Sequence, residues 1–507
     1  MATRKNWSQR ALDAVERAGN RLPDPATLFV IAILLVIVLS VVMAAFGVST
    51  THPVGKNEIG AISLLSPEML RRFLTEMPQT FAQFPPFGLV LMVMLGVGVA
   101  EKTGLIAAAL SGVIRSAPPV LLTAAVVFTG VMSSLAADAG FVVLIPLAAA
   151  LFHAVGRHPL AGLGAAFAGV SGGFSANLLI TPLDPLLAGL TQAAAQILEP
   201  SYFVAVTANY FLMVALVPLF TVLGTVITER VVEPRLAASG LVSSVAPLAP
   251  PQEGGTNERR GLLAAGVALL AVVLLMLWLV VPEDAPLRGP DGSVDPFLRS
   301  IVAFVFLAFL LSGIAFGVVT KRIRSDRDAV GLMAASMSDM AAYIVLAFFA
   351  AQFIALFAWS NLGVILAIEG ADGLRAVGFV GLPLLVAIVF FSAGVNVLIG
   401  SASAKWSILA PIFVPMLMLL GISPEATQAA YRIGDSFTNT ITPLLPYFPL
   451  ILIFAQRYAP AFGIGSLIAL MLPYSLAFGL LSTALFAAWY AFDIPFWPGI
   501  GSTYNMP

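Results

Sequence analysis

Long runs of apolar residues are the feature that most restricts how this chain can fold. The run from Pro25 to Phe46 holds no charged residue, and crossing a bilayer takes about 20 apolar residues. Similar runs recur along a chain of 507 residues, of which 59% are hydrophobic and only 10% are charged. Because a backbone in lipid must satisfy its hydrogen bonds internally, such runs are expected to form helices. The sequence therefore predicts an all-α integral membrane protein.

The composition also disfavours several classes of function. The chain contains no cysteine, which excludes disulfides, thiolate chemistry and cysteine metal sites. With a net charge of -1 and no basic patch, it is not expected to bind nucleic acid. It carries no phosphate-binding glycine loop, and its three histidines form no zinc-protease motif and no visible partner for Ser175. We therefore expect neither an enzyme nor a resident cofactor.

One polar segment interrupts the apolar runs of the second half. The segment from Arg432 to Pro446 reads RIGDSFTNTITPLLP. A charged side chain at bilayer depth costs about 2.5–3.5 kcal/mol on insertion scales, so such groups normally face a bundle interior or a water-filled cavity. Arg432 and Asp435 stand three residues apart, so on a helix they share a face and can neutralise each other. Gly434 and the two prolines disfavour one continuous helix and free backbone carbonyl groups.

The same pattern occurs once more, in the first half of the chain. Gly172 to Pro185 reads GGFSANLLITPLDP, and Gly434 to Pro446 reads GDSFTNTITPLLP. A second pair of segments, Ser134 to Pro146 and Ser401 to Pro411, follows in the same order. The copies stand roughly 260 residues apart, which is typical of transporters built from two inverted repeats with broken helices in corresponding positions. Chance recurrence of Thr-Pro is the alternative, and the second pair at the same spacing favours duplication.

The chain divides into five expected segments. Residues that are small and rich in glycine, from Pro159 to Asn177, are too interrupted to cross twice and are expected to form a re-entrant hairpin. The segments are a cytoplasmic amphipathic segment (1–24), a first membrane repeat (25–228) with a hairpin near 159–185, a cytoplasmic linker (229–260), a second membrane repeat (261–491) with a hairpin near 423–451, and a C-terminal tail (492–507).

Charged residues set the expected orientation in the membrane. Basic residues dominate before the first run, whereas acidic residues dominate between residues 283 and 299. By the positive-inside rule, the N-terminus is therefore expected to be cytoplasmic. Residues 1–20 are charged and lack the apolar core of a signal peptide, so no segment is expected to be removed.

Three long motifs resemble the AbgT family, the p-aminobenzoyl-glutamate transporters. The motifs run from Gly169 to Ala195, from Lys405 to Leu417 and from Ala430 to Leu450, and the likeness covers most of the chain. The resemblance implies a homodimer in the bacterial inner membrane, with about nine membrane-spanning helices, each of the usual length of about 20 residues, plus two re-entrant helical hairpins in an inverted repeat. It also implies a core domain that carries the substrate and an outer scaffold domain.

The resemblance further implies two activities and a set of site residues. The activities are cation-coupled uptake of p-aminobenzoyl-glutamate and energy-driven export of sulfonamide antimetabolites, which mimic p-aminobenzoate. The residues that match functional positions of the family are Trp406, Ser403, Pro424, Arg432, Asp435, Asn396 and Asp184.

Chemistry gives some of these residues plain roles in binding substrate. An aromatic carboxylate needs a ring-stacking surface and a cation, which Trp406 and Arg432 can supply. Each residue also has a structural alternative. A tryptophan often serves as a packing or interfacial anchor, and the hydroxyl of Ser403 is typical of close helix packing.

A coupling cation needs oxygen ligands, and four residues offer them. They are Asp435, Asp184, Asn177 and Asn439, of which Asp435 and the two amides form the expected Na⁺ site. A proton can use the same carboxylate. As alternatives, Asp435 can form a structural ion pair with Arg432, and the two asparagines can cap half-helices.

Two further charged positions stand in apolar surroundings. Asp138 and Lys405 hold equivalent places in the two repeats, so a pair between them is one hypothesis. Asp339 is expected to be a residue at a cytoplasmic helix end.

Paired broken helices around polar groups favour a secondary active transporter over a channel, for which a pore-lining ring would be expected. We expect a cation gradient to drive p-aminobenzoyl-glutamate, related aromatic carboxylates or sulfonamides through alternating access. A passive channel or uniporter for small organic anions is the alternative.

Overall fold

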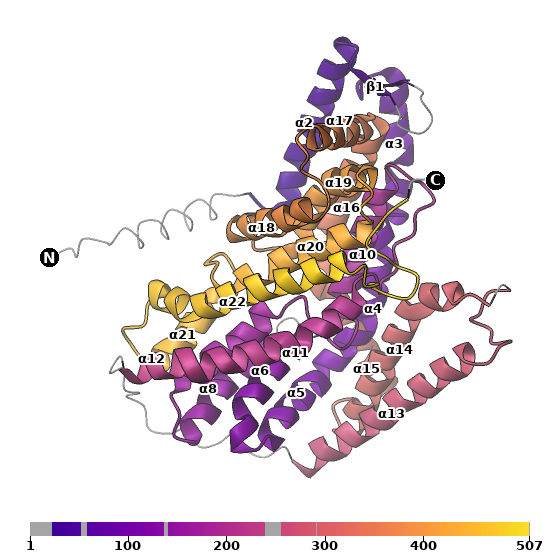
Figure 1. The fold of residues 1–507 in the computed structure, drawn as a ribbon. Coiled ribbons are helices and arrows are strands. Elements are labelled where there is room, and N and C mark those ends of the chain that lie inside the picture. Colours follow the sequence, from indigo (N-terminus) through magenta and orange to yellow (C-terminus); the bar gives the residue numbers. More distant parts are fainter. Residues whose placement is uncertain (1–22, 52–57, 136–139, 239–254, 291, 506–507) are drawn as a thin grey trace.

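The computed structural model describes residues 23–51, 58–135, 140–238, 255–290 and 292–505, and helices dominate it (Figure 1). Within these ranges, eight helices are long and apolar enough to cross a membrane. A ninth is counted if the bent pair Leu105–Ser116 and Pro119–Leu135 forms one span. The only strands in the described ranges are β1 (Ser49–Thr51) and β2 (Glu58–Gly60), which pair antiparallel. The predicted helical membrane fold is confirmed.

The first half of the chain forms ten of the described helices, several of which begin at sequence signals for helix starts. Asp24 accepts a hydrogen bond from the backbone N–H of Ala26 (2.8 Å), and Ser66 accepts one from Met69 (3.3 Å). A proline follows each of these caps, where its missing N–H costs nothing. The helices are α2 (Pro25–Ala45), α3 (Pro67–Ala82), α4 (Pro85–Lys102), α5 (Leu105–Ser116), α6 (Leu122–Met132), α8 (Ile145–Ala154), α9 (Pro159–Phe167), α10 (Leu183–Ala195), α11 (Tyr210–Ile227) and α12 (Glu233–Ala238).

The second half begins with a block of three helices that packs on α4 of the first half. Figure 1 shows α13, α14 and α15 together, and α14 packs on both α13 and α4. The helices of this half are α13 (Thr256–Val280), α14 (Asp295–Val319), α15 (Asp326–Asp339), α16 (Ala341–Trp359), α17 (Leu362–Ala376), α18 (Leu382–Leu398), α19 (Ala402–Leu419), α20 (Pro424–Phe437), α21 (Phe448–Tyr458) and α22 (Ile464–Ala491).

Two pairs of helices recur at corresponding places in the two halves. A short turn, residues 155–158, joins α8 to α9, and another, residues 420–423, joins α19 to α20. Each pair packs together. The first pair stands between α6 and α10 in the chain, and the second stands between α18 and α21. This order matches the duplication expected from the sequence.

These helix pairs begin earlier than the expected hairpins. The expected ranges, 159–185 and 423–451, start at the second arm of each pair, whereas the first arms are α8 and α19. Both first arms are apolar, so hydropathy alone does not separate them from membrane spans. Beyond the second arms the chain leaves the helical conformation, at residues 173–182 and 441–447, as the glycine and proline content predicts.

Glycines allow the second arms to approach their neighbours closely. A Cβ atom added at Gly169, in the π-turn that ends α9, would lie 2.5 Å from the carbonyl oxygen of Val127 in α6. Gly434 of α20 approaches α18 in a similar way, since an added Cβ there would meet the carbonyl oxygen of Val389. Gly169 and Gly434 therefore both allow close packing against a neighbouring helix backbone.

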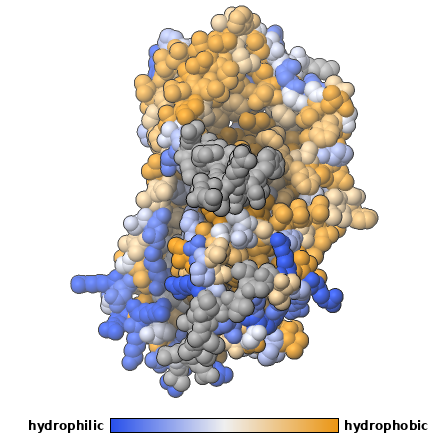
Figure 2. All heavy atoms as spheres, turned by 90° about the vertical axis from the view of Figure 1, so that its left-hand side faces the viewer, coloured by the Kyte–Doolittle hydropathy of each residue, from blue (hydrophilic) through white to orange (hydrophobic). Residues whose placement is uncertain are grey.

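The two second arms lie deepest in the protein. Every residue of α9 and of α20 is buried. By contrast, only 11% of the most apolar 18-residue stretch of α13 is buried, as expected for a helix that faces lipid. Figure 2 shows a broad apolar surface over the upper part of one face, with hydrophilic side chains gathered below it.

The expected linker and tail are more structured than predicted. A π-turn, Thr228–Val232, continues α11 into α12, so residues 229–238 are helical. The C-terminal tail covers the turn between α19 and α20: Ser423 N–H donates to the carbonyl of Ser502 (3.0 Å), and Tyr504 N–H donates to Gly421 (2.9 Å). The expected amphipathic segment before residue 23 and the rest of the linker, 239–254, lie outside the described residues.

Candidate functional site

The candidate site is built on α20, a helix that is wholly buried and yet carries charged residues. It begins at a well-formed cap, because Ser423 Oγ accepts from the N–H of Ala426 (3.1 Å) and Pro424 occupies the first helical position. It ends in the short 3-10 turn Thr438–Thr440. A buried charge is stable only when it is paired and hydrogen-bonded, so the partners of this helix define the site.

Arg432 of α20 pairs with Asp184 of α10. Arg432 Nη1 donates to Asp184 Oδ1 (2.6 Å), and the two side chains are only 4% and 0% exposed. The second carboxylate oxygen of Asp184 accepts from Thr181, both from its N–H (2.6 Å) and from its hydroxyl (2.9 Å). Among the contacts of the described residues, Arg432 Nε–H finds no acceptor. The pair therefore joins the two halves and leaves one guanidinium donor free.

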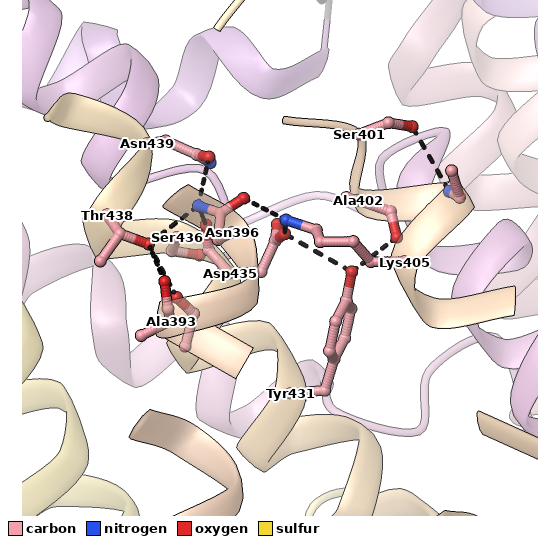
Figure 3. A network of polar contacts seen from close by, with 12 residues as sticks. Ala393, Asn396, Ser401, Ala402, Lys405, Tyr431, Asp435, Ser436, Thr438 and Asn439 are labelled. Carbon is pink, nitrogen blue, oxygen red and sulfur yellow. Dashed lines mark hydrogen bonds and ion pairs between the residues drawn. The ribbon is translucent and has the colours of Figure 1, made fainter. Parts of the chain in front are cut away.

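Asp435 pairs with Lys405 of α19, and both side chains are nearly inaccessible, 3% and 0% exposed (Figure 3). The pair between Arg432 and Asp435 that their spacing allows does not form. Although the two residues are three apart on one helix, Arg432 pairs with α10 and Asp435 with α19. Each charge therefore finds a buried partner on a different helix.

Asn396 of α18 connects these groups to the end of α20. Figure 3 shows its amide between the helices. Its Nδ2 lies within hydrogen-bond distance of three acceptors: the carbonyl of Asp435 (2.8 Å), Thr438 Oγ1 (2.9 Å) and Asn439 Oδ1 (2.7 Å). Its Oδ1 accepts from Lys405 Nζ. The structure therefore brings together three of the predicted residues, Asn396, Asp435 and Asn439, around a lysine that the sequence analysis did not place in the site.

Trp406 is fully buried between α10 and α20, and it contacts a residue of each helix. Its ring stacks on Tyr431 of α20 with 4.4 Å between ring centroids, and its Nε1–H donates to Thr191 Oγ1 (2.9 Å). The hydroxyl of Thr191 in turn donates to Gln428 Oε1 (2.6 Å). Trp406 thus links α19 to α10 and α20, and in this conformation Tyr431 covers a face of its ring.

A chain of hydrogen bonds continues from Gln428 to the start of α20. Gln428 Nε2 donates to Asn209 Oδ1 (2.9 Å), and Asn209 Nδ2 donates to the carbonyl of Glu425 (2.8 Å). The hydroxyl of Tyr202 donates to the Glu425 carboxylate (3.0 Å). Burial, followed by the charge of Glu425, raises the pKa of Tyr202 above its ordinary value, so the hydroxyl stays protonated as a donor.

The remaining predicted residues have local partners. Asn177 Oδ1 accepts from the N–H of Leu179 (2.9 Å), and its Nδ2 donates to Ser134 Oγ (3.0 Å), which is a capping arrangement. Ser403 lies one turn before Ser407, whose hydroxyl donates to the Ser403 carbonyl (2.7 Å). No contact in the described residues brings these two, or Pro424, to the Asp435 cluster.

A cavity of about 540 Å³ lies beside this cluster. Asp435 and Asn439 line it, and they are the only ones of the nine predicted site residues that do. Two of its aromatic walls, Phe141 and Tyr447, stack with 4.3 Å between centroids and 8° between planes. Ser171, also in the lining, has a buried hydroxyl without a partner among the described residues. The cavity thus combines aromatic surface with a few polar groups.

The oxygens expected to hold Na⁺ belong to one carboxylate and two neutral amides. In the part of the chain that the structure describes, no three His, Cys, Asp or Glu side chains gather at one place. Lys405 Nζ contacts one of the expected oxygens, Asp435 Oδ1, together with Oδ1 of Asn396. The charged lysine within an apolar helix is the signal that points to this contact, since a buried Asp435 requires a cation.

Two further acidic residues were singled out in the sequence, and the structure describes one of them. Asp339, the last residue of α15, pairs with Lys102 Nζ at 2.6 Å, which agrees with its expected place at a helix end. The hypothetical partner of Lys405 in the first repeat, Asp138, lies outside the described residues.

Comparison with known proteins finds relatives of the whole chain. The model of the AbgT family of transporters matches residues 10–504. The p-aminobenzoyl-glutamate transport protein of Escherichia coli (strain K12) is 38% identical over 489 residues, which cover 96% of each chain.

Two solved structures share the fold. The YdaH transporter of Alcanivorax borkumensis is 48% identical, with a TM-score of 0.89 and coverage of 94% of this chain and 100% of that one. MtrF of Neisseria gonorrhoeae, presented with a class of antimetabolite efflux pumps, is 45% identical, with a TM-score of 0.90 and coverage of 98% and 100%. The chain therefore belongs to the AbgT family of bacterial membrane transporters.

Proposed function

We propose that this protein is a secondary active transporter of p-aminobenzoyl-glutamate, related aromatic carboxylates and sulfonamide antimetabolites. The relatives named for p-aminobenzoyl-glutamate transport and for antimetabolite efflux support this class of substrate. The observation that carries the proposal is the buried arm α20, whose Arg432 and Asp435 pair with α10 and α19 beside a cavity. Ionisable residues in such a place mark transport pathways in membrane proteins.

The cavity suits an aromatic substrate. Its volume of about 540 Å³ lies within the usual range for small-molecule sites. Phe141 and Tyr447 offer aromatic faces, and Asp435 and Asn439 offer acceptors for an arylamine, the group that aminobenzoyl compounds and sulfonamides share. The free Nε–H of Arg432 offers a donor for a substrate carboxylate or sulfonyl oxygen once the substrate lies deeper in the site.

The other predicted residues contribute to this proposal as follows. Trp406 supplies ring surface after Tyr431 moves away, and Ser403 and Pro424 shape the two ends of the α19–α20 pair. Asn396 fixes the amide oxygens near Asp435. Asp184, Asn177 and Asn439 complete the set of oxygens through which a Na⁺ ion or a proton is coupled to transport.

Movement of the paired arms gives alternating access. The core, which contains α8–α9 and α19–α20, moves against a scaffold that includes α4, α13 and α14. Two such chains form a homodimer in the inner membrane with the N-terminus in the cytoplasm. Rigid-body movement of a repeat core around a fixed site is the usual mechanism of transporters with inverted repeats.

Flux measurements test the proposal. Labelled p-aminobenzoyl-glutamate and a labelled sulfonamide are offered to proteoliposomes with sodium and proton gradients imposed separately. Accumulation above the equilibrium level with either gradient is expected, and the ion that drives it is the coupling ion. Equilibration that ignores both gradients would contradict the proposal and indicate a passive channel or uniporter.

A further inference from the structure

The ammonium group of Lys405 lies between oxygen atoms, in a position that a bound cation could occupy. Lys405 stands in α19, its side chain is fully buried, and Figure 3 shows its Nζ directed between Asp435 and Asn396. The ammonium pairs with Asp435 Oδ1 and donates to Asn396 Oδ1. Carboxylate and amide carbonyl oxygens are also ligands that hard cations take in proteins, and carbonyl oxygens coordinate Na⁺ in transporters.

The surrounding hydrogen bonds fix this arrangement of oxygens. The Nδ2 of Asn396 lies within hydrogen-bond distance of three acceptors, the carbonyl of Asp435, Thr438 Oγ1 and Asn439 Oδ1, which together occupy its two N–H groups. Its Oδ1 must therefore face Lys405, since a flipped amide would direct its N–H groups at the ammonium. The hydroxyl of Tyr431 donates to the carbonyl of Ala402 (2.5 Å) and closes another side of Asp435, at 3.4 Å from Oδ1.

We propose that the Lys405 ammonium is a tethered cation that fills the cation position at Asp435, so that this site takes no Na⁺ while the lysine is in place. The inference rests on the proposed function only in treating Asp435 as part of the transport site. The inference concerns which cation neutralises the Asp435 carboxylate. The chain supplies this cation itself, as the Lys405 ammonium, and Lys405 thereby determines the ion specificity of the second repeat.

Charge balance supports this assignment. Asp435 with Lys405, and Asp184 with Arg432, form two buried pairs that are each neutral. A Na⁺ ion added at Asp435 would place a second positive charge beside the ammonium within a poorly solvated interior, where like charges repel strongly. Loss of the lysine has the opposite effect, because it leaves a buried carboxylate that requires a cation from solution.

Thermal unfolding of the purified protein in detergent tests this, with NaCl compared against choline chloride at equal ionic strength. The wild type is expected to unfold at the same temperature in both salts. Lys405→Met should unfold at a lower temperature in choline chloride and recover part of the loss in NaCl, with saturation as Na⁺ increases. The double variant Lys405→Met/Asp435→Asn should lose this response to Na⁺, because no buried carboxylate remains to be neutralised.

Two controls separate the tethered charge from general effects of the substitution. Lys405→Arg keeps a cation at the same place and should stay indifferent to Na⁺. Lys102→Met removes a lysine that pairs with Asp339 near the surface and should show no Na⁺ response. If Lys405→Met does not fold, Lys405→Gln, which retains donors to Asn396, carries the same expectation.

A wild-type protein that Na⁺ stabilises, with the effect lost in Asp435→Asn but kept in Asp339→Asn, would overturn the inference. Because ion binding is measured in detergent, this result does not depend on flux. Failure of gradient-driven accumulation would therefore count against the proposed function alone, whereas a Na⁺ response of the wild type at Asp435 would count against the tethered cation alone.

Discussion

Arg432 and Asp184 form a buried ion pair that joins the two repeats, with 2.6 Å between Nη1 and Oδ1. The two residues stand 248 positions apart in the chain. Their contact ties the second arm of one helix pair to the helix that follows the other, so the pair couples the two halves of the core.

Removal of one member of this pair should destabilise the protein strongly. Arg432→Met leaves Asp184 as an unpaired buried charge, for which about 3–5 kcal/mol is typical. The double variant Arg432→Met/Asp184→Leu should recover much of the loss, since an apolar pair replaces the charges. Thermal unfolding in detergent measures both, and strictly additive losses would show that the two residues do not act as a pair.

A surface pair provides the matched control. Arg72 and Glu76 are one helical turn apart on α3, at 3.2 Å, and both side chains are over 40% exposed. Glu76→Gln, which keeps Arg72 over the Trp359 ring, should change the free energy of unfolding by no more than about 1 kcal/mol, because solvent screens exposed ion pairs.

Gly434→Ala should disturb the packing of α20 against α18. A Cβ at this position meets the backbone oxygen of Val389, which cannot rotate away, so the helices must separate. We expect a loss of at least about 1–3 kcal/mol, as for other overpacked sites, together with reduced transport. Gly394→Ala, in α18 itself, is the control: nothing lies within 4 Å of its added Cβ, and alanine favours the helix. Equal unfolding temperatures for the two variants would contradict this packing account.

Trp406→Ala should weaken substrate affinity more than the dependence on the coupling ion. The substitution also removes a fully buried ring and its hydrogen bond to Thr191, with an expected loss of about 3–5 kcal/mol in stability. Trp406→Phe keeps a ring for stacking and loses the Nε1–H donor, so it should retain most of the affinity. Equilibrium binding of labelled p-aminobenzoyl-glutamate distinguishes the roles: unchanged affinity in Trp406→Ala would leave Trp406 with a packing role only.

The start of α15 should loosen in acid. Asp328 accepts from the N–H groups of Arg324 (2.8 Å) and Ser325 (3.0 Å), and the bond from Arg324, ahead of those from Ser325, lowers the pKa of its carboxyl. A lowered pKa in the folded state means that its stabilisation is present above the unfolded value of about 4 and is lost as the pH falls through the folded value. Amide exchange at residues 324–330 should therefore accelerate in acid in the wild type. In Asp328→Ala, amide exchange at these residues should be fast at neutral pH as well. If the variant keeps the protection of the wild type, the Asp328 carboxylate does not stabilise the start of α15.

Much of the fold was predictable because it follows from local rules. The apolar run that starts at Pro25 predicts a membrane helix, and the structure places α2 there. The repeated motifs predict two related halves, and the resemblance to the AbgT family is confirmed by the matched family model. Periodicity, caps and motif spacing all act over a few residues, so a single sequence is sufficient for them.

The partners within the site were less predictable because they depend on contacts between distant segments. Spacing along α20 predicts a pair between Arg432 and Asp435, yet the nearest opposite charges come from Asp184 and Lys405. The helix pairs also begin before the expected hairpin ranges, since α8 and α19 are apolar and hydropathy does not separate them from membrane spans. Burial and tertiary geometry decide both questions, and neither is encoded in local periodicity.

Alternating access of the cavity is the central claim, and a thiol accessibility measurement tests it most directly. The chain has no cysteine, so a single Ala402→Cys substitution in the cavity lining gives a signal without background. The exposed loop variant Ser201→Cys serves as the control for sidedness. An impermeant thiol reagent, applied from either side of oriented proteoliposomes, should label position 402 mainly from one side. Saturating substrate should shift that labelling toward the other side, while Ser201→Cys remains unchanged. Equal labelling of position 402 from both sides, unaffected by substrate, would contradict alternating access.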